Sequence, residues 1–318
     1  MIGSDISKAA KLLSDGELVA IPTETVYGLA ANAFNGSAVA KIYETKGRPQ
    51  FNPLIIHSNS FEKFLSWGIQ IPESAFKLAE KFSPGPLTMV VPKGNSIPDI
   101  VTAGHPSVAI RIPNHTLCLD LLKLLDFPLA APSANISGSI SPTSAQHVYD
   151  QFGEKIPYIL DGGICQVGLE STIISFTGSS PALLRLGGLA IEEIENTLGQ
   201  KLDLSRLLNN ENPEAPGMLS RHYAPQTKLK VGNYADLPDH LKNGKIYCIR
   251  FSNYIPELPK NHQILLSEKG SLNEAAQALF AVMRQVDSMQ ADLILAEKFP
   301  ETGLGLAIND RLKRAEIK

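Results

Sequence analysis

Residues 18–29 read LVAIPTETVYGL, a short apolar run followed by a polar turn. Because β-branched and apolar side chains are concentrated in residues 18–21, this run predicts a buried strand. Comparable units, each a short apolar run with a helical pattern near it, recur up to about residue 199. Such alternation is typical of an α/β domain, in which helices flank a sheet. The first 200 residues are therefore predicted to form an α/β domain.

Turn and cap signals support the predicted elements of this domain. Gly47 directly follows a helical pattern, and Pro-Gly-Pro at residues 84–86 ends another. The predicted helices cover residues 37–46, 73–82, 116–125, 144–152 and 191–198. The predicted strands cover residues 18–21, 54–57, 87–91, 108–112, 129–131, 158–160, 172–176 and 182–186.

A second domain is predicted after a connector. Residues 209–217 read NNENPEAPG, and Asn, Pro and Gly favour exposed turns over packed elements. Beyond them, a long helix begins at Ser271, which forms a capping box with Glu274. Predicted strands around it cover residues 228–231, 245–251, 263–266 and 293–296. The expected organisation is a main domain at 1–200, a linker at 201–226 and a small α/β domain at 227–318.

Composition describes an ordinary soluble globular protein. Of 318 residues, 43% are hydrophobic and 19% are charged, and the net charge of -3 gives no global attraction to polyanions. The three cysteines, Cys118, Cys165 and Cys248, form no C-x-x-C pair, so buried free thiols are expected rather than a metal site. No signal peptide or membrane span is recognised, which predicts a cytoplasmic protein without membrane contact.

Several common catalytic motifs are missing from the sequence. It contains no G-x-x-x-x-G-K-[ST] loop, no H-E-x-x-H and no G-x-S-x-G. Gly303 and Gly305 are followed by Ile308 where the dinucleotide fingerprint requires glycine. The P-loop, zinc protease, serine hydrolase and nicotinamide-binding classes therefore lose their usual support.

The remaining polar segments lie where predicted strands or helices end, and ligands of open α/β sheets gather beyond strand ends. Lys46 and Arg48 are two cations at one helix end, so they either stabilise the helix dipole or bind a triphosphate. Asn52 follows them, and His57 at the next strand end is typical of a satisfied core histidine. Thr23 in the first turn belongs either to a capped turn or to a small-substrate site.

Arg111 is a charge in an apolar strand, where it shares one face with Ser107 and Ala109. A charge in such a strand is rarely unpaired. Its partner is expected to be either a substrate carboxylate or a structural Asp or Glu.

Residues 131–143, APSANISGSISPT, form the densest polar segment. Small side chains permit close approach to a ligand, and the hydroxyls and backbone N–H groups suit phosphate oxygens. The alternative is a plain serine-rich loop. Arg185 directly precedes the Leu-Gly-Gly turn at residues 186–188. It is either another phosphate contact or part of a surface ion pair.

Taken in order, these segments resemble the YrdC-like threonylcarbamoyl-adenylate synthase family in its long form. The matching series is PTETVYGL, KGRP, NPLIIH, PGPLT, SANISGSISPT, DGG and EST, followed by PGM and RHYAP. The chain departs from the family at Leu186, where proline is usual, and at residues 219–220, which replace a commonly basic or aromatic pair before Arg221. The resemblance implies a twisted mixed-sheet YrdC-like domain with flanking helices, plus a smaller C-terminal Rossmann-like α/β domain.

The resemblance also implies an activity and its site. L-threonine captures bicarbonate as a carbamate, which attacks the α-phosphate of ATP, so that a tRNA-modifying nucleotidyltransferase is expected. Mg²⁺ is expected with ATP, and catalysis is assigned to Lys46, Arg48 and Arg111. The implied threonine pocket consists of Thr23, His57, Arg111, Ala131 and Ser171. The implied ATP contacts are Lys46, Arg48, Asn52, Ser107, Ser133, Asn135, Ser141 and Arg185, with Tyr223 closing over the nucleotide.

Two other functions stay open beside this one. The same fold could act as an RNA-binding module with a weak RNA contact, although the net charge does not favour it. A carbamoyl-transferring enzyme of related fold usually carries zinc-finger regions, which three scattered cysteines do not supply. The downstream partner implied by the family is the transferase complex that modifies adenosine in tRNA.

Overall fold

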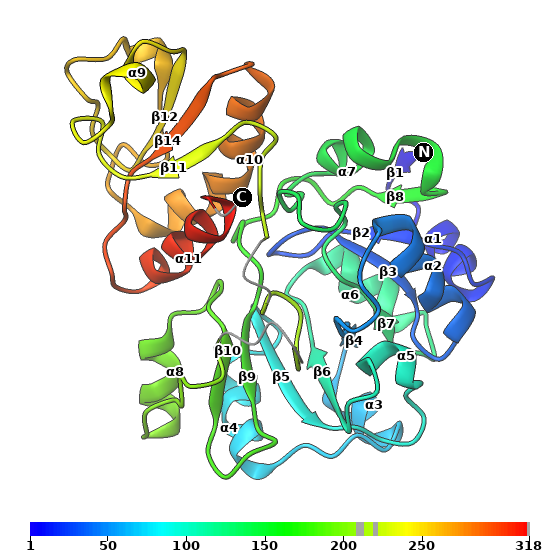
Figure 1. Ribbon diagram of the computed structural model, residues 1–318. Coiled ribbons are helices and arrows are strands. Elements are labelled where there is room, and N and C mark those ends of the chain that lie inside the picture. The colour runs from blue at the N-terminus through cyan, green and yellow to red at the C-terminus, as the bar shows by residue number, and fades with distance from the viewer. Residues whose placement is uncertain (208–212, 219–221, 317–318) are drawn as a thin grey trace.

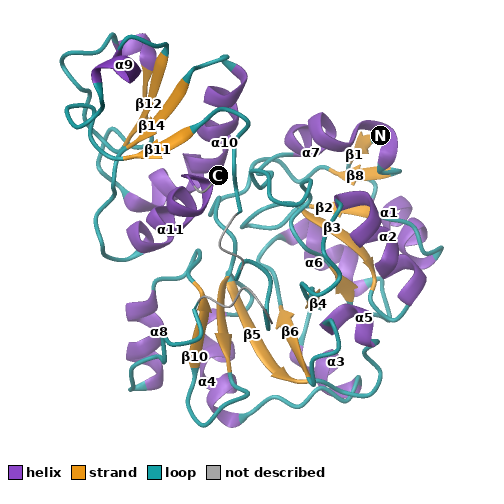
Figure 2. Ribbon diagram, viewed as in Figure 1, coloured by secondary structure: helices purple, strands orange, loops and turns teal. Residues whose placement is uncertain are grey.

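The computed structural model describes residues 1–207, 213–218 and 222–316, which form two α/β bodies (Figure 1). The first body is built on a ten-stranded sheet of order β1-β8-β2-β3-β7-β4-β6-β5-β9-β10. Helices cover its faces, with α8 packed beside α4 (Figure 2). The second body is built on a four-stranded sheet of order β11-β14-β12-β13. The predicted fold class, a mixed-sheet domain with a smaller α/β domain, is confirmed.

The strands of the large sheet are short and mostly buried. They are β1 (Ile2–Gly3), β2 (Val19–Ile21), β3 (Gly28–Asn32), β4 (Ile55–His57), β5 (Leu87–Pro92), β6 (Ser107–Arg111), β7 (Leu129–Ala130), β8 (Tyr158–Leu160), β9 (Thr172–Ser175) and β10 (Ala182–Arg185). Its helices are α1 (Ile6–Ser14), α2 (Gly36–Lys46), α3 (Phe61–Ser66), α4 (Glu73–Phe82), α5 (Asp99–Thr102), α6 (Thr116–Lys123), α7 (Ala145–Phe152), η1 (Gly153–Lys155) and α8 (Ile191–Leu198).

The pairing register of the central strands brings distant residues together. Strands β4 and β6 are parallel, with His57 paired to Arg111, and β7 is antiparallel to β4, with Leu129 opposite His57. The chain continues from β7 directly into Ala131. Because β4 and β6 are parallel, His57 and Arg111 lie together where these strands end, whereas Ala131 lies at the start of β4, where its N–H donates to the carbonyl of Ile55 at 3.0 Å.

The smaller body is an all-parallel sheet with helices around it. Its strands are β11 (Leu229–Val231), β12 (Ile246–Arg250), β13 (Gln263–Leu265) and β14 (Leu293–Ala296), and its helices are α9 (Asp239–Lys242), η2 (Lys260–His262), α10 (Leu272–Ser288) and α11 (Leu304–Glu316). The hydroxyl of Ser271 accepts from the N–H of Glu274, as the capping box predicts, whereas the N–H of Ser271 donates to Ser267 Oγ and not to Glu274. No helix in the described ranges is long and apolar enough to span a membrane.

The two bodies share a hydrophobic cluster. Val26, Ile140 and Leu169 of the first body pack with the buried faces of α10 and α11. Gly168 approaches the backbone of α10 so closely that a Cβ atom there would overlap Gln277. The smaller body is therefore packed against the polar loops of the larger one, on the side where β4 and β6 end (Figure 1).

The prediction of an exposed connector is wrong for residues 213–217. Pro213 and residues 215–218 are buried, and Ala215 and Met218 pack with sheet residues of β5, β6, β9 and β10. Two apolar side chains among the turn-forming residues thus hold this part of the connector against the sheet. The rest of residues 209–217 and residues 219–221 lie outside the described residues.

Several elements were not predicted from the sequence. These are β1, β3, α1, α3, α5, α9 and α11 and the two short 3₁₀ turns. Other boundaries agree to within one or two residues, and β8, β14, α4 and α8 have the predicted bounds. The three cysteines are free and buried, as expected.

Candidate active site

One cavity lies between the strand ends, the polar loops and the linker. Its interior volume is about 40 Å³, which is small beside typical ligand sites. Its lining comes from both the first 200 residues and the linker: Thr23, Val26, Gly28, Arg48, Ile55, His57, Arg111, Ala131, Pro132, Ser133, Glu170, Ser171, Arg185, Pro216, Gly217, His222 and Tyr223. Segments far apart in the sequence therefore meet at one polar cavity.

All five residues expected to contact threonine line this cavity: Thr23, His57, Arg111, Ala131 and Ser171. Thr23 has a structural role as well, because its Oγ1 accepts from the N–H of Val26 at 3.2 Å and lies 2.8 Å from Thr25 Oγ1. The Ser171 hydroxyl lies 2.7 Å from Thr88 Oγ1. These hydroxyls are thus held in fixed positions before any ligand arrives.

Arg111 is paired with a carboxylate that the sequence did not single out. Its Nη2 lies 2.9 Å from Glu24 Oε2, and its Nε donates to the carbonyl of Gly85 at 3.2 Å. These contacts occupy Nη2 and Nε, and the structure shows no hydrogen bond of Nη1 within the described residues. The open question about its partner is answered by a structural Glu, while the guanidinium keeps N–H donors available to a ligand in the cavity.

His57 is a buried neutral base. Burial and the nearby Arg111 charge lower the pKa of His57 to about 3. Its Nδ1 lies 3.4 Å from the carbonyl of Leu129. At neutral pH it therefore adds no positive charge to the cavity.

Four of the residues expected to hold ATP line the cavity: Arg48, Ser133, Arg185 and Tyr223. Arg48 donates to Asn52 Oδ1 at 2.6 Å and to the carbonyl of Pro53 at 2.8 Å. Arg185 donates through Nη2 to the Ser171 hydroxyl at 3.0 Å and through Nη1 to the carbonyl of Pro216 at 3.2 Å. Both arginines are buried and hydrogen-bond to neutral acceptors, but Arg185 also lies close enough to Glu170 to interact with its charge, so the Arg48 charge is the less compensated of the two.

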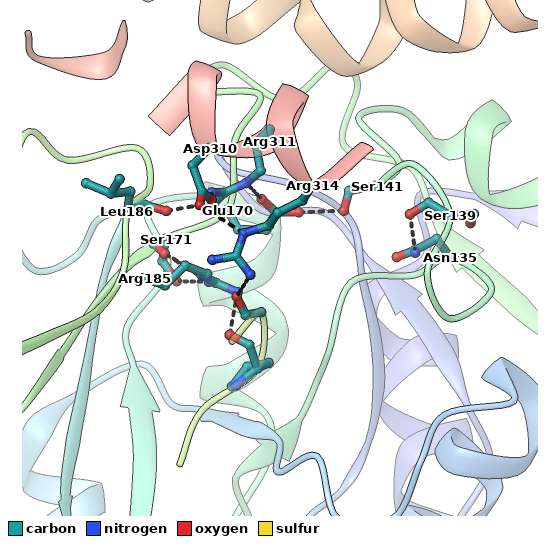
Figure 3. A network of polar contacts seen from close by, with 12 residues as sticks. Asn135, Ser139, Ser141, Glu170, Ser171, Arg185, Leu186, Asp310, Arg311 and Arg314 are labelled. Carbon is teal, nitrogen blue, oxygen red and sulfur yellow. Dashed lines mark hydrogen bonds and ion pairs between the residues drawn. The ribbon is translucent and has the colours of Figure 1, made fainter. Parts of the chain in front are cut away.

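Four other predicted ATP residues are not part of the described lining but form hydrogen bonds with it or with the loops that carry it. Lys46 Nζ donates to the carbonyls of Ser133, at 2.5 Å, and Asn135. Asn52 accepts from Arg48, and the Ser141 hydroxyl donates to Glu170 Oε1 at 2.5 Å. The side-chain amide of Asn135 donates to the carbonyl of Ser139 at 2.9 Å, within the same loop (Figure 3).

Ser107 is a predicted ATP residue that is not part of the described lining. It begins β6, whereas Arg111 ends it four positions further along the strand, a separation of about 13 Å. The assignment of each of these residues to threonine or ATP stays a prediction.

Sequence reasoning missed Glu170 and His222, which also line the cavity. Burial alone would raise the pKa of Glu170, but the guanidiniums of Arg311 and Arg185 and the Ser141 hydroxyl outweigh it and hold the pKa at about 2. Burial lowers the pKa of His222 to about 3. The EST and RHYAP motifs contained both residues, but neither motif indicates which side chain faces the cavity.

Tyr223 is fixed by aromatic and cationic neighbours. Its backbone is left-handed, with φ of 65°, and its ring stacks on Phe280 of α10 with a centroid distance of 5.5 Å. The Arg311 guanidinium lies 5.0 Å from the ring centroid. The linker wall of the cavity is therefore held by the C-terminal body.

Comparison with known proteins assigns the family. The model of the family described as "Telomere recombination" matches residues 11–187, and that described as "Threonylcarbamoyl-AMP synthase, C-terminal domain" matches residues 189–316. A threonylcarbamoyl-AMP synthase of Pyrococcus abyssi is 43% identical over 96% of this chain and 92% of its own length. The chain belongs to the threonylcarbamoyl-AMP synthase family. This family membership agrees with the resemblance read from the motif series.

Other relatives extend the agreement to the whole chain. A threonylcarbamoyl-AMP synthase of Bacillus subtilis is 40% identical over 98% of this chain and 92% of its own length. The crystal structure of Pyrococcus abyssi Sua5 complexed with L-threonine superposes with a TM-score of 0.89. That match has 42% identity and covers 98% of this chain and 94% of the other. The family's fold thus includes both bodies and the linker.

Proposed function

We propose that the chain synthesises threonylcarbamoyl-AMP from L-threonine, bicarbonate and ATP and releases pyrophosphate. The observation that carries the proposal is the meeting of all five expected threonine residues with Arg48, Ser133 and Arg185 on one cavity. The full-length relatives that bear the synthase name support the same reaction. In reaction class, the enzyme is a nucleotidyltransferase.

The proposed chemistry has two balanced steps. The threonine amine adds to the carbon of bicarbonate, and loss of water leaves a carbamate. A carbamate oxygen then attacks the α-phosphorus of ATP, the α–β bridging P–O bond breaks, and pyrophosphate leaves. No protein nucleophile is needed, because positioning and charge stabilisation account for catalysis of this kind.

Each group in the cavity has a physical role in this proposal. The N–H groups of Arg111 face a threonine carboxylate, and the uncharged His57 packs beside it without competing for the anion. The guanidiniums of Arg48 and Arg185 neutralise charge that develops on the phosphates. Buried charges act strongly here because little water screens them.

Mg²⁺ enters this proposal as the counter-ion of ATP. No group of three or more His, Cys, Asp or Glu side chains gathers within the described ranges. Glu170, the carboxylate that lines the cavity, is already paired with Arg311. This donor set fits a metal held mainly by phosphate oxygens and water, and the metal would supply charge neutralisation there.

The proposal also names a cellular setting. It includes a cytoplasmic location and, as the family resemblance implies, delivery of the labile product to a tRNA threonylcarbamoyl transferase complex. Binding of RNA as the primary role is the rival, and it requires neither threonine nor ATP.

One assay tests the proposal. The protein is incubated with Mg²⁺-ATP, and pyrophosphate is measured with threonine and bicarbonate added separately and together. Release is expected only when both are present. Release that is independent of either one would exclude the proposed reaction, and a salt-sensitive RNA affinity without any release would favour the rival.

A further inference from the structure

Arg311 of helix α11 crosses from the C-terminal body to the cavity wall. Its side chain has 0% exposure, and its Nε donates to Glu170 Oε2 at 2.9 Å. Its Nη2 donates to the carbonyl of Leu186 at 2.8 Å, and its Nη1 pairs with Asp310 at 2.6 Å (Figure 3). One fully buried side chain thus joins α11 to two segments of the first domain.

The residues that Arg311 contacts in the first domain and the linker line the cavity or adjoin a residue that does. Glu170 and Tyr223 line it, and Leu186 directly follows Arg185, which also lines it. The Arg311 guanidinium lies over the Tyr223 ring. Arg311 itself is absent from the described lining, so it acts on a ligand only through the residues that it holds.

A second arginine on the same helix supports the linker. Arg314 Nη1 donates to the carbonyl of Gly217 at 2.8 Å, and its Nε donates to Asp310 Oδ1 at 2.9 Å. Asp310 therefore holds both arginines in a fixed relation. The buried arginines of α11 therefore hold the linker segment that lines the cavity in place (Figure 3).

We propose that Arg311 is a positioning residue for ATP, supplied to the active site by the C-terminal domain. It neutralises the Glu170 carboxylate on the cavity wall and fixes Tyr223 and the turn after Arg185. This inference rests on the proposed function, because it assumes that the cavity accepts a triphosphate. It assigns the C-terminal domain a part in nucleotide binding rather than only a structural attachment.

The charge of Glu170 makes the inference specific. If Arg311 loses its charge, a carboxylate is left on the wall of a cavity that binds a more strongly negative ligand. Like charges brought together in a partly dry site repel strongly, so ATP binding should weaken more than threonine binding. Removing the Glu170 charge as well should relieve that repulsion.

The experiment compares four full-length variants: Arg311→Met, Arg311→Lys, the double variant Glu170→Gln/Arg311→Met, and Arg250→Met as a control. Arg250 lies in the same domain and forms an ion pair with Glu297 at 2.7 Å, with each side chain 16% exposed. Its loss therefore reports the cost of breaking a partly buried arginine pair without touching the cavity. Measurements are the thermal midpoint, ATP affinity by calorimetry without threonine, and kcat with KM for each substrate.

Arg311→Met is expected to weaken ATP binding by about tenfold or more, with a smaller change in the KM for threonine. The double variant should recover much of the ATP affinity, and Arg311→Lys should retain part of it. Arg250→Met should change thermal stability but not ATP affinity. A purely structural role predicts that the double variant is no better than Arg311→Met, and that result would overturn the inference, as would unchanged ATP affinity in Arg311→Met.

The same measurements separate this inference from the proposed function. A wild-type protein that binds ATP without threonine-dependent pyrophosphate release would refute the proposed reaction, while the calorimetric comparison would still decide the role of Arg311. A wild-type protein that binds no ATP would overturn both.

Discussion

Arg111 and Glu24 form a buried ion pair beside the cavity, with Nη2 and Oε2 2.9 Å apart and side chains 5% and 4% exposed. The two residues come from different segments, β6 and the turn after β2. The carboxylate fixes the guanidinium at the strand end without saturating its N–H groups within the described residues. A residue proposed to bind the threonine carboxylate is thus held in place by a protein carboxylate.

Arg111→Lys should therefore impair threonine use selectively. Lysine keeps the charge that Glu24 requires but loses the planar fork that binds a carboxylate in bidentate fashion. Because hydrogen bonds to charged groups contribute about 1.5–3 kcal/mol, the KM for threonine should rise by roughly 10- to 150-fold. Calorimetric titration with threonine and with ATP separates the two effects, and equal losses for both ligands would remove the assigned role.

Gly168→Ala should loosen the contact between the two domains. Gly168 has φ of 74°, and a Cβ there would overlap the backbone of α10. Gly199 is a matched control, because it has φ of 68° and open space around it. An alanine there has the same conformational cost but no steric overlap. Gly199→Ala should cost about 1 kcal/mol, whereas Gly168→Ala should cost about 1–3 kcal/mol more because of the steric overlap. Urea unfolding measures both, and equal losses would contradict the close packing.

Much of the fold could be predicted because its strands are short, apolar and separated by strong turn signals. Strand β3 was missed because GLAAN is composed of residues with weak strand propensity, and its place between β2 and β7 depends on tertiary pairing. Helix α11 was missed because buried arginines interrupt its apolar stripe. Besides Asp310 of the same helix, its arginines bond groups more than 90 positions away, Glu170 and Gly217.

The candidate site was predicted by motif order rather than by individual chemistry. Glu24 and Glu170 are isolated carboxylates in the sequence, and their importance depends on partners from other segments. Residues 209–217 were predicted to be exposed because their turn-forming residues outnumber Ala215, which packs on the sheet together with Met218. Residue types thus indicated where polar loops lie, whereas tertiary packing decided which side chains face the cavity.

The stability of the protein should fall in mildly acidic solution because of two histidines, the buried His57 and the half-buried His222. Burial lowers the pKa of both His57 and His222 to about 3, against an ordinary value of 6.5. The unfolded chain therefore binds protons first, so stability is full above pH 6.5 and is lost as the pH falls toward 3. Within that window each histidine should contribute a loss of up to about 1.4 kcal/mol per pH unit.

Urea unfolding of wild type, His57→Gln and His222→Gln at pH 7 and 5.5 measures this loss. Each substitution should reduce the slope of unfolding free energy against pH by the contribution of one histidine. His240→Gln is the control, because His240 is exposed on α9. Variants at positions 57 and 222 with the same pH slope as wild type would show that these histidines are not buried in neutral form.

Lys46→Met should weaken ATP use, and Lys63 provides a matched comparison. Both ammonium groups donate to two backbone carbonyls: Lys46 to Ser133 and Asn135, and Lys63 to Leu122 and Leu125. The carbonyls held by Lys46 belong to the loop that carries Ser133 into the cavity, whereas those held by Lys63 belong to the end of α6. Leaving buried carbonyls without donors costs about 1–3 kcal/mol, so both variants should lose stability, and Lys46→Met should lose more because Lys46 is the more deeply buried.

The ATP dependence should distinguish the two lysine variants. Loss of Lys46 removes a cation beside the proposed phosphate site and releases the loop around Ser133, so the KM for ATP should rise by about tenfold or more. Lys63→Met changes neither feature, and its KM for ATP should stay within about twofold of wild type, a change worth less than 0.5 kcal/mol in binding. Steady-state pyrophosphate release at saturating threonine and bicarbonate gives both values. If the two variants raise the KM for ATP equally, the effect comes from general loss of stability and Lys46 has no specific part in nucleotide binding.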